Sequence, residues 1–231
     1  MDFFTTVQTR RSIRRFTNEV VPDTVIQKAL HAAILAPNSS NTQTWNFYWA
    51  KTETSKKRIA EICLNQSAAR TAQQLIVVTA DPKLWRRSQG PIVKYVESVS
   101  APEPVQMYYK KLIPITYRWG LFNCLAPIKW LISTSVGFFR PMVRGPYTKR
   151  DLQEVAIKSA ALAAENFVLA ITAQGYDSCM MEGFDKCRLH GFLKLKSSEA
   201  IVMVIGIGKG AERGTWGPRF RIDSSLVIKE I

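Results

Sequence analysis

The stretch TKRDLQEVAIKSAALAAENFVLAITAQG, residues 148–175, decides the fold because it predicts one long helix. Thr148 and Asp151 have the spacing of a capping box, although that motif prefers Glu or Gln in the second position, and Gly175 favours a helix end. Alanines let neighbouring elements approach closely, so we expect a central and largely buried helix. The alanines concerned are Ala156, Ala160, Ala161, Ala163 and Ala164.

Apolar runs on both sides of this helix predict strands. Residues 200–208, AIVMVIGIG, form a near-continuous apolar run that is typical of an interior strand. Residues 45–50, WNFYWA, predict a short aromatic strand, and residues 73–81, QQLIVVTAD, a β-branched strand that ends in a turn signal. An amphipathic helix is predicted over 21–37, ending at Pro37. The chain therefore alternates helix and strand.

Length and composition indicate one globular unit that we expect to span residues 1–231. The formal net charge of +14 favours anionic partners, but the basic residues are spread along the chain, so we do not expect nucleic-acid binding. The four cysteines form no CxxC pair, so we expect no metal site and buried free thiols. The amino-terminal residues do not resemble a signal peptide, and a cytoplasmic location is expected.

Residues 100–147 differ from the rest because they are rich in aromatic, proline and basic residues and show no clean period, so we expect an insertion. The stretch 119–139 is about long enough to cross a bilayer, but polar residues and a proline interrupt it. Three alternatives stay open: a spanning helix, an interfacial membrane helix giving peripheral contact through 111–146, and packing over a site or a partner subunit.

The stretch TRRSIRRF, residues 9–16, places four arginines around one serine. Forked guanidinium donors and a small hydroxyl are the groups that a dianionic phosphate needs. In an extended segment Arg10, Ser12 and Arg14 fall on one face, whereas Arg11 and Arg15 point elsewhere. A solvated basic strand is the alternative interpretation.

Three further stretches carry candidate binding groups. Residues 36–47, APNSSNTQTWNF, concentrate small hydroxyls and amides, which either cap helices or bond the polar edge of a heterocycle. Residues 175–185, GYDSCMMEGFD, predict an apolar turn in which a backbone N–H faces a ligand, and Glu182 has no partner suited to acid–base work. Residues 206–221, GIGKGAERGTWGPRFR, add cationic donors at Lys209, Arg219 and Arg221 but lack the spacing of a Walker loop.

Taken together and in this order, the four stretches resemble the FMN-dependent nitroreductase family over residues 8–87 and 148–221. The resemblance implies an α+β, three-layer fold, with a central, mostly antiparallel sheet flanked by helices, in an intertwined homodimer. FMN is the implied cofactor, and the chemistry is flavin-centred, with no catalytic side chain. The implied cofactor-binding residues are Arg10, Arg11, Ser12, Arg14, Pro37, Asn38, Ser39, Asn41, Asn65, Met181, Glu182, Gly183, Arg219 and Arg221.

The expected activity is transfer of a hydride from NAD(P)H through flavin N5 to a planar aromatic acceptor such as a nitroaromatic or quinone. Alternatives are a dehydrogenase or reductive dehalogenase of the same fold, or a flavin-binding protein on a membrane surface. The sequence departs from the family pattern at Asn38, at Thr44 in place of proline, and at Ala68 in place of a lysine that some members carry. Losing that cation would stabilise a reduced anionic flavin less.

Overall fold

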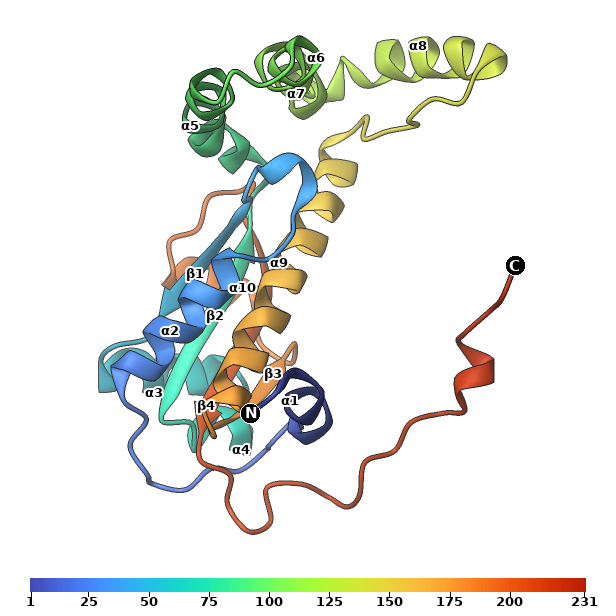
Figure 1. Ribbon diagram of the computed structural model, residues 1–231. Helices are drawn as coiled ribbons and strands as arrows, with labels where there is room; N and C mark the ends of the chain where they lie inside the picture. The colour runs from blue at the N-terminus through green and yellow to red at the C-terminus, as the bar shows by residue number, and fades with distance from the viewer.

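The computed structural model describes all residues 1–231 and contains one four-stranded antiparallel sheet (Figure 1). Its strands are β1 (Trp45–Trp49), β2 (Gln74–Ala80), β3 (Asp177–Met181) and β4 (Ala200–Gly208), in the order β1-β2-β4-β3. β2 and β4 are central, and their register places Ile76 opposite Ile205. The predicted α+β class with an antiparallel sheet is confirmed.

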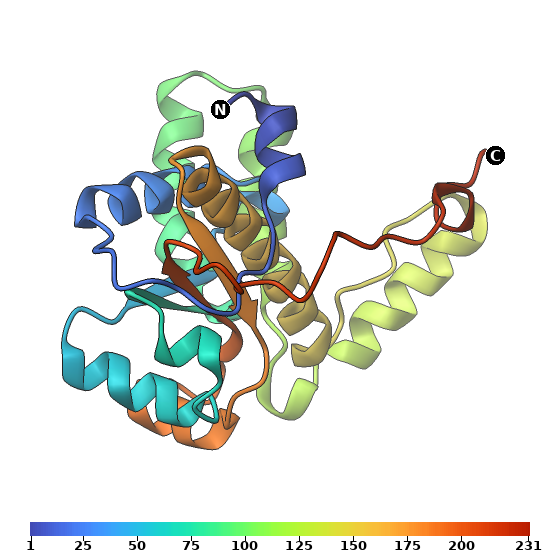
Figure 2. The same ribbon diagram turned by 90° about the horizontal axis from the view of Figure 1, so that it is seen from below.

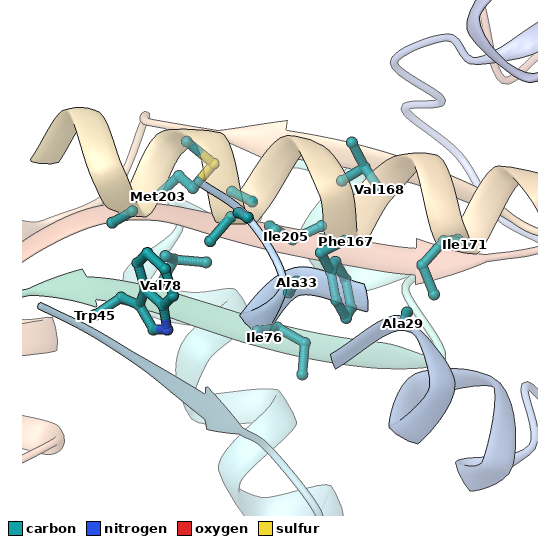
Figure 3. Close-up of a cluster of buried hydrophobic side chains, with 14 of the residues drawn as sticks. Ala29, Ala33, Trp45, Ile76, Val78, Phe167, Val168, Ile171, Met203 and Ile205 are labelled. Carbon is teal, nitrogen blue, oxygen red and sulfur yellow. The ribbon is translucent and has the colours of Figure 1, made fainter. Parts of the chain in front are cut away.

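One face of the sheet is covered by α2 (Asp23–Ile34) and α9 (Lys149–Ala173). Figure 3 shows Phe167 and Ile171 of α9 packing over Ile76 of β2 and beside Ala29 of α2. Four of the five predicted alanines of α9 are buried, and Ala161 is partly exposed. Small side chains let α9 lie close to α2 and the sheet, as the sequence predicts.

The opposite face is covered by α3 (Glu53–Ile62), α4 (Ser67–Arg70) and α10 (Lys186–Phe192). Alternation along β2 sends Leu75 and Val77 to this face and Ile76 and Val78 to the α9 face. Because both faces are covered, the central strands are mostly apolar, and the three-layer prediction is confirmed.

The ends of α9 follow the sequence signals. The Thr148 hydroxyl accepts a hydrogen bond from Asp151 N at 3.2 Å, and the Asp151 carboxylate accepts from Thr148 N at 3.0 Å, so the capping box forms. These backbone donors hold the pKa of Asp151 below its ordinary value. Gly175 follows the helix with a φ of +83°, which glycine adopts without strain.

Residues 85–139 form a chain of helices at one end of the molecule (Figure 1). They comprise α5 (Trp85–Ser98), α6 (Glu103–Met107), the π-helical turn η3 (Tyr108–Leu112), α7 (Ile113–Tyr117), the turn η4 (Leu121–Asn123) and α8 (Ala126–Phe139). A small core of Trp85, Ile113, Tyr117 and Leu152 joins them to α9. The segment without a clean period is thus largely helical.

The structure corrects two expectations, the alternative of a membrane-spanning helix and the predicted apolar turn. The stretch 119–139 forms only the 14-residue α8, which is too short to span a bilayer. Only α9 is long and apolar enough to cross a bilayer, but half of its most apolar stretch is buried in the core of the protein. The apolar turn predicted for Met180–Gly183 is wrong for Met180 and Met181, which end the edge strand β3 (Asp177–Met181). Cys63 and Cys179 are buried free thiols, as expected, but Cys124 and Cys187 are exposed.

The remaining short elements lie at the chain ends and in loops. The amino terminus forms α1 (Phe3–Thr9), and η1 (Ser39–Asn41) and η2 (Pro82–Leu84) flank β1 and β2. After β4 the chain leaves the body as an extended tail that contains only η5 (Ser224–Leu226), which Figure 2 shows from below.

Candidate functional site

Residues 10–16 form an extended segment between β3 and the chain that follows β4. Ile13 N donates to Ser178 O at 3.0 Å on one side, and Arg14 N donates to Gly214 O at 2.7 Å on the other. Ala211 N donates to Arg15 O at 2.9 Å. This backbone pairing brings together two basic stretches that are about two hundred residues apart in sequence.

The pairing is so close that glycine is needed in the second stretch. A Cβ atom on Gly214 would lie 2.9 Å from Ile13 Cγ2 and 3.0 Å from the carbonyl oxygens of Ala211 and Arg15. A Cβ atom on Gly208 would lie 2.8 Å from Phe16 Cβ. Gly208 and Gly214 therefore serve close backbone approach.

The two stretches enclose a pocket of about 330 Å³. It is lined by five arginines, one serine and two aromatic rings. The lining residues are Arg10, Arg11, Ser12, Arg14, Thr215, Trp216, Gly217, Pro218, Arg219, Phe220 and Arg221. All six predicted residues of the two basic stretches are thus gathered in one place, which we call the arginine pocket. Arg15 is not among them.

Most guanidinium groups of the arginine pocket bond backbone carbonyls instead of carboxylates. Arg11 Nη2 donates to Gly217 O at 2.6 Å, and Arg219 Nη2 donates to Gln8 O at 2.8 Å and to Arg10 O. Arg14 lies 4.5 Å from the centre of the Trp216 ring. The nearest acidic group is Glu165 of α9, whose Oε1 is 4.0 Å from Arg10 Nε. The positive charge is therefore largely uncompensated, as an anion site requires.

The electrostatic influence of the pocket extends to β3. Burial raises the pKa of the Cys179 thiol, and the positive charges of Arg14 and Arg10 partly oppose that rise. Cys179 lies four residues before Gly183, so the strand beside the pocket leads directly into the Met181–Gly183 turn.

Two details of the basic stretches depend on the tertiary structure. Simple alternation turns Arg11 away from Arg10, but Arg11 lines the pocket, because the segment makes only isolated bridges and is not a regular strand. Lys209 is absent from the pocket, and its Nζ donates to Gly175 O at 2.8 Å near the end of α9.

The hydroxyl- and amide-rich residues 37–43, which we call the polar loop, lie away from the arginine pocket of their own chain. Pro37, Asn38, Ser39 and Asn41 do not line that pocket. Asn38 Oδ1 accepts from Gln43 N at 2.8 Å, and Ser39 N donates to Ser159 of α9 at 3.4 Å. Left-handed backbone at Ser40, Asn41 and Gln43 gives the loop a tight and defined shape.

The remaining predicted residues lie in a third region; they are Asn65, Met181, Glu182 and Gly183. Gln66 Nε2 donates to Gly183 O at 2.8 Å, which holds the loop carrying Asn65 beside the Met181–Gly183 turn. Met181 is buried, whereas Glu182 and Gly183 are exposed. Ala68 is buried in α4 against β4, since its carbonyl would be 2.8 Å from a Cβ on Gly206.

Residues 85–139, which we call the helical segment, contact the polar loop directly. Ser40 Oγ lies 2.6 Å from Tyr108 OH, and Thr42 Oγ1 lies 3.2 Å from Tyr117 OH. Between the loop, α7, α8 and residues 142–147 is a mostly apolar cavity of about 510 Å³. Its polar lining includes Tyr108, Lys129 and the hydroxyl pair Ser133–Tyr147 at 2.6 Å. We call it the apolar cavity.

Sequence reasoning missed several groups that the structure places at these sites. Trp216 and Phe220 line the arginine pocket, and their position inside GTWGPRFR between cations is the signal that was available. Gln66 had no such signal, because its role depends on the distant carbonyl of Gly183.

The sheet, its two helical layers and the arginine pocket define a flavin-type oxidoreductase scaffold, and the comparisons agree. The model of the nitroreductase family matches residues 7–209, so this chain belongs to that family. Protein DrgA of Synechocystis is 30% identical over 213 residues, which are 92% of this chain and 86% of that protein. A protein of Archaeoglobus fulgidus assigned as an NADH dehydrogenase/NAD(P)H nitroreductase is 37% identical over 41% of this chain and 53% of its own.

Further matches differ in what they share with this chain. Iodotyrosine deiodinase of Hydra vulgaris is 38% identical over 26% of this chain and 22% of its own length. A protein of Exiguobacterium sibiricum assigned as a nitroreductase and crystallised with FMN has a TM-score of 0.71 at 22% identity, covering 100% of this chain and 98% of that chain. Family membership makes this chain an NAD(P)H-dependent flavin oxidoreductase.

Proposed function

We propose that this chain binds FMN and passes a hydride from NAD(P)H to a planar acceptor such as a nitroaromatic or quinone. The arginine pocket is the observation that carries the proposal. Its residues fit the phosphate of FMN because the pocket combines a hydroxyl with guanidinium groups that carboxylates leave largely uncompensated. When bound, FMN supplies the redox chemistry, and the protein supplies binding, orientation and electrostatics.

Each group of this chain has a specific task in the proposal. Arg10, Ser12 and Arg14, with Arg219 and Arg221, hold the phosphate and the ribityl chain. Arg11 braces the pocket through its bond to Gly217 O. The backbone of Met181, Glu182 and Gly183 faces the ring, and Asn65 bonds its polar edge. Support comes from the Gln66–Gly183 hydrogen bond, which keeps these two loops together.

The polar loop is assigned to the flavin of a second subunit. Pro37, Asn38, Ser39 and Asn41 lie outside the arginine pocket of their own chain. A homodimer is supported by apolar side chains that find no cover within the chain, on α1 at Phe3 and Phe4 and along the tail at Leu226 and Ile228. Figure 1 shows the tail extended away from the body, as an arm that wraps another copy would be.

We assign the apolar cavity to the acceptor and residues 100–147 to its cover. The hydrogen bonds Ser40–Tyr108 and Thr42–Tyr117 connect this segment to the polar loop. Tyr117 is buried in the small core with Trp85 and so anchors the segment, whereas Tyr108 lines the cavity. A cytoplasmic location completes the proposal.

The direct test is flavin content and turnover. Full-length protein purified at neutral pH should be yellow, with close to one FMN per chain, and should oxidise NAD(P)H only when a nitroaromatic or quinone is present. A colourless protein that does not bind added FMN would refute the proposal.

A second candidate activity is reductive dehalogenation, which the match to iodotyrosine deiodinase favours. In this proposal the chain uses the same fold and the same FMN, and only the acceptor differs. Release of halide from a halogenated phenol by the reduced enzyme, faster than reduction of nitroaromatics, would favour it.

A further inference from the structure

Helix α8 presents an apolar stripe to the outside of the molecule. The stripe follows the helical spacing i, i+3, i+4, i+10 and i+11, and its members are between 53% and 86% exposed. They are Ile128, Leu131, Ile132, Phe138 and Phe139. The preceding turn η4 adds Phe122, which is 95% exposed. We call these six residues the α8 stripe.

Part of the polar side of α8 is turned inward, whereas Ser135 is exposed. Lys129 Nζ donates to Thr116 O at 2.9 Å and to Arg118 O at 2.6 Å, and its burial lowers its pKa. Ser133 is buried and paired with Tyr147. A surface helix of a globular protein normally has the opposite orientation. An apolar stripe of this size facing outward indicates a docking surface.

The segment that carries the stripe is mostly positive, although Lys110 is paired with Glu97 at 2.7 Å. Residues 104–150 contain no Asp or Glu and eight Lys or Arg, so this fifth of the chain carries eight of the net fourteen positive charges. Six of these cations are exposed: Lys110, Lys111, Arg118, Arg140, Arg144 and Arg150. Trp130 of α8 is 55% exposed, and tryptophan is favoured at the interface level of a bilayer.

We propose that the α8 stripe docks in the plane of a membrane surface that contains anionic lipid. Apolar side chains enter the boundary between headgroups and acyl chains, and the surrounding cations contact lipid phosphates. The 14-residue length of α8 suits this position and excludes spanning. Anionic lipid complements the positive charge of residues 104–150, whose exposed cations can contact lipid phosphates.

The test uses the full-length, flavin-loaded protein and vesicles of phosphatidylcholine with and without phosphatidylglycerol. Wild-type protein should sediment with the anionic vesicles at low salt and less at high salt. Leu131→Glu/Phe138→Glu should lower the apparent affinity at least tenfold. The control Val20→Glu adds one of these two negative charges at a residue that is 75% exposed but outside the stripe, and it should bind as wild type does.

Separate readouts keep the outcomes distinct. Flavin content and light scattering of the double variant should equal those of wild type, because the α8 stripe is not part of the flavin site or of a self-interface. Conversion to a monomer or loss of flavin would show that the stripe covers another copy, and would overturn the proposal. Absence of wild-type binding to anionic vesicles at low salt would also overturn it. If the double variant does not fold, Lys111→Glu/Arg140→Glu should weaken binding to anionic vesicles and leave neutral ones unaffected.

Discussion

Two basic regions of this protein use the same kind of side chain in opposite ways. In the arginine pocket, five guanidinium groups from residues 10–14 and 219–221 converge on about 330 Å³, and three of them bond backbone carbonyls. In residues 104–150, eight cations are spread along helices whose outer face is apolar. The first arrangement suits a small, highly charged group, and the second suits an extended surface.

The difference shows that a positive net charge predicts anionic partners in general but does not predict which anion binds at which place. Convergence depends on a backbone scaffold, here the pairing of residues 10–16 with 209–214, which fixes donor directions. Dispersed cations have no such scaffold. They attract anions through a general electrostatic field, which salt screens within about one Debye length. Charge alone would therefore not have separated an anion pocket from a docking surface.

The largest expected effect concerns the arginine pocket. Arg14→Ala removes a charged donor and should weaken FMN binding about 10- to 100-fold, since such hydrogen bonds contribute about 1.5–3 kcal/mol. Arg15→Ala, the neighbouring arginine that does not line the pocket, should leave the Kd unchanged. Quenching of FMN fluorescence on titration gives both constants. Equal losses in the two variants would mean that the pocket acts only as a basic surface.

A backbone change tests whether the scaffold creates the convergence. Gly214→Ala places a methyl group 2.9 Å from Ile13 Cγ2 and 3.0 Å from two carbonyl oxygens, so the two stretches must separate. We expect a loss of about 1–3 kcal/mol in the free energy of unfolding, together with weaker FMN binding. Chemical denaturation measures the first quantity. Gly191, where an added Cβ meets nothing within 4 Å, provides the control Gly191→Ala. Full stability in Gly214→Ala would contradict the proposed tight pairing.

A smaller effect on stability is expected at the start of α9, where the helical segment leads into this helix. Thr148→Ala removes the hydroxyl that accepts from Asp151 N, and should cost about 1 kcal/mol of stability. Because the folded-state pKa of Asp151 is lowered, its contribution is complete above the ordinary value of 3.8 and is lost as pH falls through the lower folded pKa. Asp151→Asn should therefore flatten the dependence of Tm on pH below about 4. An unchanged slope in that variant would exclude Asp151 as the cause.

The smallest effect comes from the one carboxylate near the arginine pocket. Glu165→Gln removes the partial compensation of Arg10 and should tighten FMN binding only about two- to fivefold, as expected for a half-exposed ion pair. The gain should shrink in high salt. Isothermal titration at two salt concentrations checks both statements, and Glu154→Gln, on an exposed part of α9, is the matched control. Weaker binding in Glu165→Gln would show that the carboxylate instead positions Arg10.

Much of the fold was predictable because its strongest elements carry local signals. Residues 200–208 were predicted as a strand with the bounds that β4 has, and the capping box and Gly175 marked the ends of α9. β3 was missed because DSCMM, an edge strand, opens with polar residues and shows no alternation. The helices of residues 103–139 were missed because prolines and basic residues break their apolar period.

For the site, the sequence alone determined which residue types are present: the arginines and serine of 9–16, the polar loop and the terminal basic pair. It also determined the family resemblance that their order carries. Only the tertiary structure decided that Lys209 stays outside the pocket and that Trp216 contacts Arg14. It alone turned the apolar side of α8 outward. The physical reason is that donor direction and exposure depend on backbone pairing between distant segments, which no local pattern records.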